Sequence, residues 1–519
     1  MMVEKLSKTD KTTLFFSLFL VGMAVYYAFR MFGIVPWYDE LYTYYYFISR
    51  GPVYAAIHWP LPNNHVGYSV LSACLLIFGN SAFALRGISY LCSLGSLMLL
   101  YRIAGRIRKG ALALVPVFLF AGLQLVNQLA VQGRGYALVT FCYLVAILQL
   151  IRITEKDTKW NYIVWAIFLL LSLWAIPSSI YMVLPLCVAG GLTLLCKKEY
   201  RKLWKLVLAS LVSAAGTVFL YGVLWLAVGS NLLCKAEGGN YYGMGHIDVI
   251  RKAPFSALKA GIDYMLASPY IQSVGREGFL ARFADWIGNL FGIHFSYLSL
   301  GGSTVFWGVV VVIGCVFLVK GMIRQPDFFG IYFLVSLIML PGMLAVQCKL
   351  PYYRVFSFAG AMIALLAGWT FGKLGECFKE SKIRRQYMEA ITAALTFVLC
   401  ILSLLHSGQS YGNREDMLSE AYRNVKIQDC GRIAVTDCDQ EYLLLYQYGI
   451  GQEQVTRDLR EADCVVVDRY LLGEDGYGQS QDAPELWKLY LTREDALLRE
   501  VMAECQIIYE NEYFAVYKK

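Results

Sequence analysis

The stretch FGNSAFALRGISYLCSLGSLMLLYRIAGRI, residues 78–107, decides the fold class. Its centre, 84–104, is an apolar run of about the 20 residues that cross roughly 30 Å of hydrocarbon. The run leads into a cluster of basic residues, which comprises Arg102, Arg106, Arg108 and Lys109. Loops on the cytoplasmic side of a membrane are enriched in Lys and Arg. The stretch therefore predicts a membrane-spanning helix that ends at the cytoplasmic face.

The composition of the 519-residue chain agrees with a membrane protein. Hydrophobic residues make up 58% of it and charged residues 16%, whereas a soluble domain carries roughly 25% charged residues. The net charge of +8 comes from Lys and Arg clustered between apolar runs, which is typical of membrane loops and does not indicate nucleic-acid binding. We therefore predict an α-helical polytopic membrane protein.

About 11 apolar runs are candidate spans. They cover 12–33, 84–104, 111–130, 136–151, 160–177, 179–196, 203–229, 298–319, 328–347, 355–372 and 387–405. The first run resembles a signal peptide, but it is long and no A-x-A cleavage site follows it, so we predict that it is retained. The segment 66–79 is too short for a typical span. The basic clusters before and after this segment are both predicted to be cytoplasmic, so we expect 66–79 to lie along the outer interface.

This choice places the remaining basic loops on one side of the membrane, with the N-terminus cytoplasmic and the C-terminus extracytoplasmic. Residues 1–406 are then a transmembrane domain with outer loops at 34–83 and 230–297. The tail, 407–519, alternates strand and helix patterns: GRIAV, EYLLLYQYG, CVVVD, a helix over 484–504, and a hairpin with Asn511-Glu512 near its turn. We predict a small extracytoplasmic α/β domain.

Two motifs in the tail resemble ligand sites without their usual context. Asp437-Cys438-Asp439 is a D-x-D that follows a predicted strand, and we interpret it as a turn. The glycines of GEDGYG, 473–478, lack the strand and helix that flank a phosphate loop. A disulfide is possible in the tail, but the sequence does not show which cysteines would pair. The candidates are Cys430, Cys438, Cys464 and Cys505.

Asp39 and Glu40, in PWYDELYTYYYF (36–47), are the candidate catalytic residues. A carboxylate kept at membrane depth is costly and indicates function, and the surrounding aromatic residues suit the headgroup level. A polyprenyl-phosphate sugar would present its reacting carbon at that level, where a carboxylate can act as general base. The alternative is that Asp39 caps a helix. Adjacent helical residues point in different directions, so we expect only one of the two to be the base.

The donor's leaving phosphate needs cations, and Arg86, Arg134 and Arg354 are predicted at outer ends of spans. Their forked guanidinium groups suit phosphate; the alternatives are snorkelling or an ion pair, for example of Arg86 with Asp39 or Glu40. His65, in LPNNHVGYSV, is a further candidate for donor phosphate binding or for a metal site. Its alternative is a polar turn at the interface. With no other acid nearby, a divalent metal is possible but not favoured.

These motifs together resemble the GT-C superfamily of glycosyltransferases, on the branch of protein O-mannosyltransferases and lipid A aminoarabinose transferases (glycosyltransferase family 39-like). The resemblance covers roughly 30–370. Besides the Asp-Glu pair, the NNH segment and 78–107, it rests on QGRGYALVTFCYLVAILQL (132–150) and LPYYRVFSFAGAMIALLAG (350–368).

The resemblance implies an inverting transferase that uses a polyprenyl-phosphate sugar outside the cytoplasm. Asp39 matches the catalytic acid of that family, Glu40 its neighbour, and Arg86 the arginine that braces the first loop. His65 matches the His of an H-P-P motif whose first Pro is Val66 here. Arg134 and Arg354 are placed by position alone.

We therefore predict a glycosyltransferase of the cell membrane, with Asp39 as general base and no certain cofactor beyond its lipid-linked donor. The acceptor remains open among protein, lipid and cell-envelope glycan. The alternative is a transporter or flippase of lipid-linked glycans, which would more typically carry charges within spans or inverted repeats. A scaffold with a membrane anchor would not need so many spans.

Overall fold

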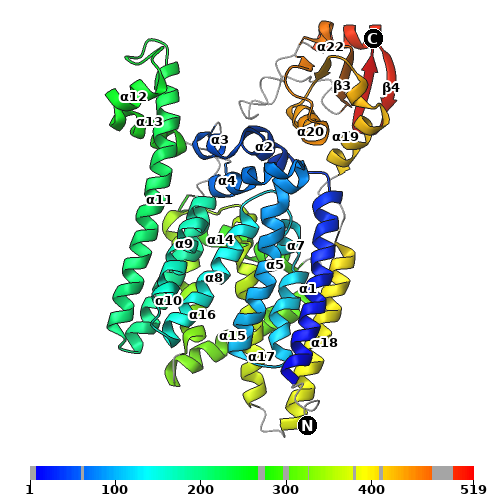
Figure 1. Ribbon diagram of the computed structural model, residues 1–519. Helices are drawn as coiled ribbons and strands as arrows, with labels where there is room; N and C mark the ends of the chain where they lie inside the picture. Colours follow the sequence, from blue (N-terminus) through cyan, green and yellow to red (C-terminus); the bar gives the residue numbers. More distant parts are fainter. Residues whose placement is uncertain are drawn as a thin grey trace.

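The computed structural model describes residues 8–59, 64–266, 275–295, 303–324, 327–377, 382–407, 413–456, 458–469 and 495–519. Long helices form a bundle, a layer of short helices covers one end of it, and a small α/β domain stands beyond that layer (Figure 1). The helix that begins the chain starts at the opposite end of the bundle from the α/β domain.

Eight helices in the described ranges are long and apolar enough to cross a membrane. They are α1 (Lys8–Gly33), α5 (Ser81–Ile107), α8 (Tyr136–Glu155), α10 (Ile180–Cys196), α11 (Tyr200–Lys235), α16 (Phe328–Gln347), α17 (Phe358–Cys377) and α18 (Lys382–His406). Two more predicted spans have shorter apolar parts, in α9 (Lys159–Ala175) and α15 (Ser303–Arg324). The predicted multi-helix membrane fold is therefore confirmed.

The predicted span 111–130 differs from the structure because it is broken. It consists of a 3-10 turn (Ala111–Leu114), α6 (Val115–Gly122) and α7 (Gln124–Leu129). The break falls at Leu123, whose backbone is extended (φ −67°, ψ 129°). Pro116 does not cause it, since proline is tolerated in the first turn of a helix. The break turns α7 and the residues after it toward the layer of short helices.

That layer contains α2 (Tyr38–Tyr46), α3 (Pro52–Ile57) and α4 (Val66–Cys74), which continues as a 3-10 turn (Leu75–Phe78). These helices lie across the end of the bundle (Figure 1). The 66–79 segment thus forms a short helix of this layer and is not one of the long apolar helices. Ile77 and Phe78 at its end are exposed apolar residues, as expected for a helix that contacts the membrane interface.

The second predicted outer loop is largely helical. α11 extends to Lys235, and α12 (His246–Lys252) and α13 (Pro254–Leu266) follow it, with α13 packed back against α11. The approach is close: a Cβ at Gly229 would lie 1.8 Å from the carbonyl oxygen of Ala257. Only glycine fits there. α14 (Phe279–Phe295) then returns to the bundle end that carries the short helices.

The tail forms a five-stranded sheet in the order β2-β1-β3-β5-β4. β1 (Ile433–Val435), β2 (Val455–Thr456) and β3 (Cys464–Asp468) are parallel, whereas β4 (Gln506–Glu510) and β5 (Phe514–Lys518) form the predicted antiparallel hairpin. Its helices are α19 (Asn413–Asn424), α20 (Cys438–Tyr448) and α22 (Asp495–Glu504). α22 is the end of the predicted helix 484–504; the rest of that helix, and GEDGYG, lie outside the described residues.

A disulfide joins Cys430 to Cys464, with their Cα atoms 6.2 Å apart, while Cys438 and Cys505 are free. It ties the segment before β1 to the first residue of β3. The pairing selects one of the possibilities that the sequence leaves open.

The α/β domain packs directly on α2. Leu41, Tyr42 and Tyr45 of α2 belong to the same buried cluster as Leu443 of α20 and Val466 of β3. The Tyr45 hydroxyl donates a hydrogen bond to Glu441 and accepts one from Gln452 Nε2 at 2.6 Å. α2 is therefore held between the bundle and the α/β domain, so the position of Asp39 and Glu40 depends on both.

Candidate active site

The two acidic residues lie in the first turn of α2, where negative charge is favoured by the helix dipole. The N-cap of this helix is Trp37, not Asp39. The capping alternative for Asp39 is therefore wrong. As adjacent helical residues, Asp39 and Glu40 point in different directions and have different surroundings.

Glu40 is fully buried in an ion pair with Arg86. The pair is bidentate: Arg86 Nε donates to Glu40 Oε1 at 2.7 Å and Nη2 donates to Oε2 at 2.9 Å. The backbone N–H groups of Gly133 and Trp37 donate to the same carboxylate at 2.6 and 3.1 Å. Arg86 Nη1 also donates to the carbonyl oxygen of Ile34 at 2.6 Å. The network joins the end of α1, the start of α2, α5 and the segment after α7.

This geometry differs from the prediction that Glu40 is catalytic and that Arg86 binds the donor phosphate. Both side chains are saturated by each other and by the backbone, and neither is exposed. It matches the ion-pair alternative and the bracing role that the resemblance implied for Arg86. Burying both charges is costly, and the bidentate geometry with its backbone partners offsets that cost.

Asp39 faces an open cavity and is paired there with Arg354. Arg354 Nη1 lies 2.8 Å from Asp39 Oδ2, and the guanidinium also lies over the rings of Trp37 and Tyr352, at 5.6 and 5.1 Å. The cavity has a volume of ≈ 540 Å³. Its other lining residues are Leu125, Gln128, Leu129, Gln132, Ile293 and Tyr353. Thus the structure brings Asp39 and Arg354 together, although they are far apart in sequence.

His65 and Arg134 are both buried, and neither is among the described residues that line this cavity. His65 Nδ1 accepts a hydrogen bond from the Gly135 N–H at 3.0 Å. Arg134 Nη1 donates to Thr43 Oγ1 at 2.6 Å, and Arg134 Nη2 lies 3.3 Å from His65 Nε2. Burial, reinforced by the charges of Arg134 and Arg354, lowers the pKa of His65 well below its usual 6.5. His65 is therefore neutral at neutral pH.

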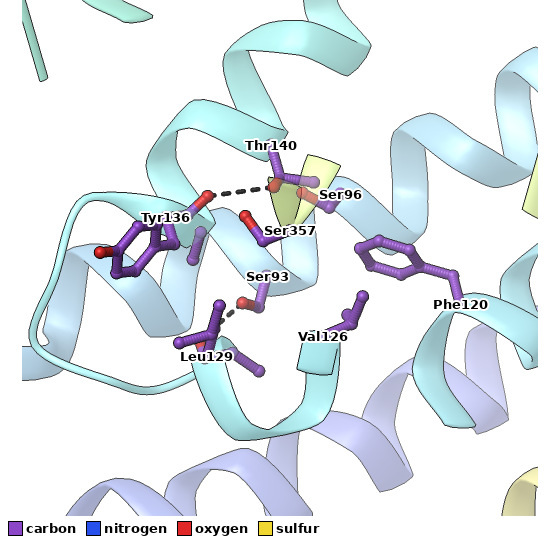
Figure 2. Close-up of a pocket in the computed structure, with 10 residues that line it drawn as sticks. Ser93, Ser96, Phe120, Val126, Leu129, Tyr136, Thr140 and Ser357 are labelled. Carbon is purple, nitrogen blue, oxygen red and sulfur yellow. Dashed lines mark hydrogen bonds between the residues drawn. The ribbon is translucent and has the colours of Figure 1, made fainter. Parts of the chain in front are cut away.

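A second, much smaller cavity lies deeper in the bundle (Figure 2). Its polar lining includes Ser93, Ser96, Thr140 and Ser357, and its volume is ≈ 20 Å³. In Figure 2 the Thr140 hydroxyl donates to the carbonyl oxygen of Tyr136, at 3.0 Å. A space of this size holds about one water molecule. It is too small for a sugar, whereas the Asp39 cavity is large enough and carries the predicted catalytic carboxylate.

The D-x-D segment has a structural explanation. Asp437 is the N-cap of α20, in a capping box with Gln440. Asp437, Cys438 and Asp439 are close enough together to hold a metal. However, Arg414 Nη2 lies 2.6 Å from Asp437, and Arg414 Nη1 lies 2.8 Å from Asp439. Arg414 therefore places a positive charge beside both carboxylates, and the segment begins α20 instead of forming the predicted turn.

The sequence analysis missed Gln128 and Gln132, which line the cavity with Asp39. Their signal was a group of carboxamides in an apolar run, together with Gln124 and Asn127. Gln128 lies on α7, whereas Gln132 lies in the segment after this helix ends at Leu129. The break before α7 falls beside Gly122, a residue that is unfavourable inside a helix.

Residues 65–225 match the family described as dolichyl-phosphate-mannose-protein mannosyltransferase. The fold is similar to that of ArnT from Cupriavidus metallidurans, whose crystal structure is bound to undecaprenyl phosphate. That match has 12% identity and a TM-score of 0.55, and it covers 96% of this chain and 97% of ArnT.

A further similar structure is the archaeal oligosaccharyltransferase AglB from Archaeoglobus fulgidus, in complex with an inhibitory peptide and a dolichol-phosphate. It has 11% identity and a TM-score of 0.48, with coverage of 88% of this chain and 69% of AglB. Among curated proteins, no sequence matches the chain.

Proposed function

We propose that this chain is a membrane glycosyltransferase of the GT-C superfamily and that it transfers a sugar from a polyprenyl phosphate to an acceptor hydroxyl in the cavity lined by Asp39 and Arg354. The observation that carries the proposal is the pairing of these two side chains in one open cavity at the end of the bundle. Its volume of ≈ 540 Å³ lies within the range of small-molecule sites. The bound undecaprenyl phosphate of ArnT supports a lipid-phosphate donor.

Asp39 acts as the general base. The acceptor oxygen attacks the anomeric carbon of the donor sugar while the Asp39 carboxylate takes the hydroxyl proton. The bond from that carbon to the phosphate oxygen breaks, and its electron pair leaves with the lipid phosphate. A single displacement inverts the configuration at the anomeric carbon.

Arg354 stabilises the leaving phosphate. Its guanidinium lines the same cavity as Asp39, and a fixed positive group stabilises charge that develops on a leaving oxygen. Before the donor binds, the guanidinium of Arg354 is paired with the Asp39 carboxylate. A bound phosphate can then share the remaining N–H donors of the guanidinium.

Glu40, Arg86, His65 and Arg134 are positioning residues in this proposal. Arg86 and Glu40 fix the start of α2 against α5, and Arg134 bonds the middle of α2 through Thr43. Their role is to hold Asp39 at the edge of the cavity. A base displaced by about 1 Å loses much of its effect.

We propose that the cavity and the α/β domain are extracytoplasmic and that the N-terminus is cytoplasmic. Two observations support this orientation. The N-terminal end of α1 and the α/β domain lie at opposite ends of the bundle (Figure 1). The last turn of α5, which carries Arg106, lies near the start of α1, because the Tyr101 hydroxyl of α5 is 3.1 Å from Thr13 Oγ1. The disulfide between Cys430 and Cys464 suits an oxidising compartment.

Labelling of single-cysteine variants tests the orientation. Cys505 in the α/β domain is free and half-buried, and Cys196 at the end of α10 is free and exposed. A thiol reagent that does not cross membranes is expected to label Cys505 in intact cells, and Cys196 only after lysis. The reverse pattern would contradict the proposed orientation. Cys430 is unsuitable because its sulfur is in the disulfide.

Release of free lipid phosphate tests the function itself. The purified protein is given undecaprenyl-phosphate-linked mannose, glucose or aminoarabinose, with membranes of cells that lack the protein as the source of acceptor. We expect acceptor-dependent release of undecaprenyl phosphate from at least one donor. Movement of the intact donor across a vesicle bilayer without release would instead support the transporter alternative.

A further inference from the structure

We infer that Gln132 is a specificity-determining residue that forms a hydrogen bond with a hydroxyl group of a neutral donor sugar. This inference rests on the proposed function and goes beyond it, because it concerns which sugar the cavity selects. Gln132 lines the cavity together with Asp39 and Arg354.

The backbone of Gln132 is held by hydrogen bonds, whereas one atom of its side chain has no hydrogen-bond partner. Its carbonyl oxygen accepts hydrogen bonds from Ser89 Oγ at 2.6 Å and from the Arg134 N–H at 2.7 Å. The side chain is 4% exposed, and its Oε1 atom is buried without a hydrogen-bond partner. A buried acceptor without a hydrogen-bond partner is energetically unfavourable. A sugar hydroxyl that binds in the cavity can remove this cost, since the terminal torsion of glutamine is broad and lets the carboxamide turn.

The charges around the cavity favour a neutral sugar. Within the described lining, the charged side chains are Asp39 and Arg354, and they pair with each other. A cationic amino sugar or an anionic uronic acid would therefore lack a free partner and would lose its hydration.

The rest of the lining suits a sugar ring. Trp37, Tyr352 and Tyr353 provide aromatic surface, and Gln128 adds a second carboxamide. Ligand sites commonly combine such apolar surface with a few polar groups that set specificity. Here the carboxamide of Gln132 is the buried group that remains to be satisfied.

Donor binding to the full-length protein tests the inference. The probes are undecaprenyl-phosphate mannose, glucose and aminoarabinose, and the monodeoxy analogues of whichever neutral donor binds most tightly. We expect the neutral donors to bind more tightly than aminoarabinose, and one deoxy analogue to bind about tenfold more weakly than its parent. In Gln132→Leu the parent is expected to bind about tenfold more weakly, and that deoxy analogue to lose no further affinity.

Gln124→Leu is the matched control, because Gln124 is on α7 and does not line the cavity; its donor affinity should be unchanged. Equal affinity of wild type for all deoxy analogues, a measurement independent of any variant's folding, would overturn the inference. Tighter binding of aminoarabinose would overturn it too. If either result is found while the wild-type protein still releases lipid phosphate, the proposed function stands. If no donor leads to release, both the proposed function and the role of Gln132 are contradicted.

Discussion

Asp39→Asn is expected to lower kcat for sugar transfer by about 10²–10⁴-fold, the usual contribution of a general base. The amide keeps the size of the side chain but cannot take the proton of the acceptor hydroxyl. It also removes the charge that pairs with Arg354 in the cavity. The measurement is the rate of lipid phosphate release at saturating donor, with the wild-type protein alongside.

The control for this variant is Asp248→Asn, at an exposed position in α12. This substitution also removes an aspartate carboxylate, but from the other predicted outer loop, 230–297. We expect wild-type turnover. The thermal unfolding of Asp39→Asn should stay close to that of wild type, because its ion pair is partly exposed to the cavity. Turnover by Asp39→Asn within threefold or so of wild type would exclude Asp39 as the base, since a base contributes far more.

Glu40→Gln is expected to destabilise the protein by about 3–5 kcal/mol, because removing one partner of a buried ion pair leaves the other charge uncompensated. The charge left behind is that of Arg86, which is fully buried between α1, α2 and α5. The measurement is thermal unfolding of the purified protein in detergent. The expected result is a large fall in the midpoint together with poor yield.

Glu155→Gln is the matched control. Glu155 also pairs with an arginine, Arg106, but both side chains of this pair are nearly half exposed. An exposed pair contributes about 0–1 kcal/mol, so this variant should unfold close to wild type. Equal destabilisation by the two substitutions would show that burial does not increase the contribution of the Glu40 pair to stability. A Glu40→Gln protein that unfolds at the wild-type temperature would contradict the structural role of the buried pair.

Much of the fold could be predicted because membrane helices are determined by local composition. Runs such as 328–347 are apolar throughout, and the basic clusters between runs indicate the side. The short segment 66–79 was separated from the spans by length and by the flanking charges. The strands of the tail followed from their β-branched residues and from the turn at Asn511, whose Oδ1 accepts from the N–H of Phe514 at 2.9 Å.

The break in 111–130 was not predicted, because the run as a whole is apolar and long enough for one span. Leu123 nevertheless lies between Gly122 and Gln124, and glycine is unfavourable in the interior of a helix. α7 and Gln132, which lines the cavity, follow this break.

The candidate site was predicted in part. Sequence identified Asp39 and Arg354 as separate candidates, but their contact depends on how α2 and the segment before α17 meet in space. It favoured Asp39 over Glu40 as the general base, but it did not show which of the two side chains faces a cavity. The choice depends on the rotation of α2 about its axis, which is set by the cluster that α2 shares with the α/β domain.

The most direct test of the central claim is a structure of the full-length protein, in lipid, with undecaprenyl phosphate bound. We expect the phosphate in the Asp39 cavity, within hydrogen-bonding distance of the Arg354 guanidinium, with its isoprenoid chain leading out toward the membrane. A phosphate bound elsewhere, with the Asp39–Arg354 pair left as it is here, would contradict the account.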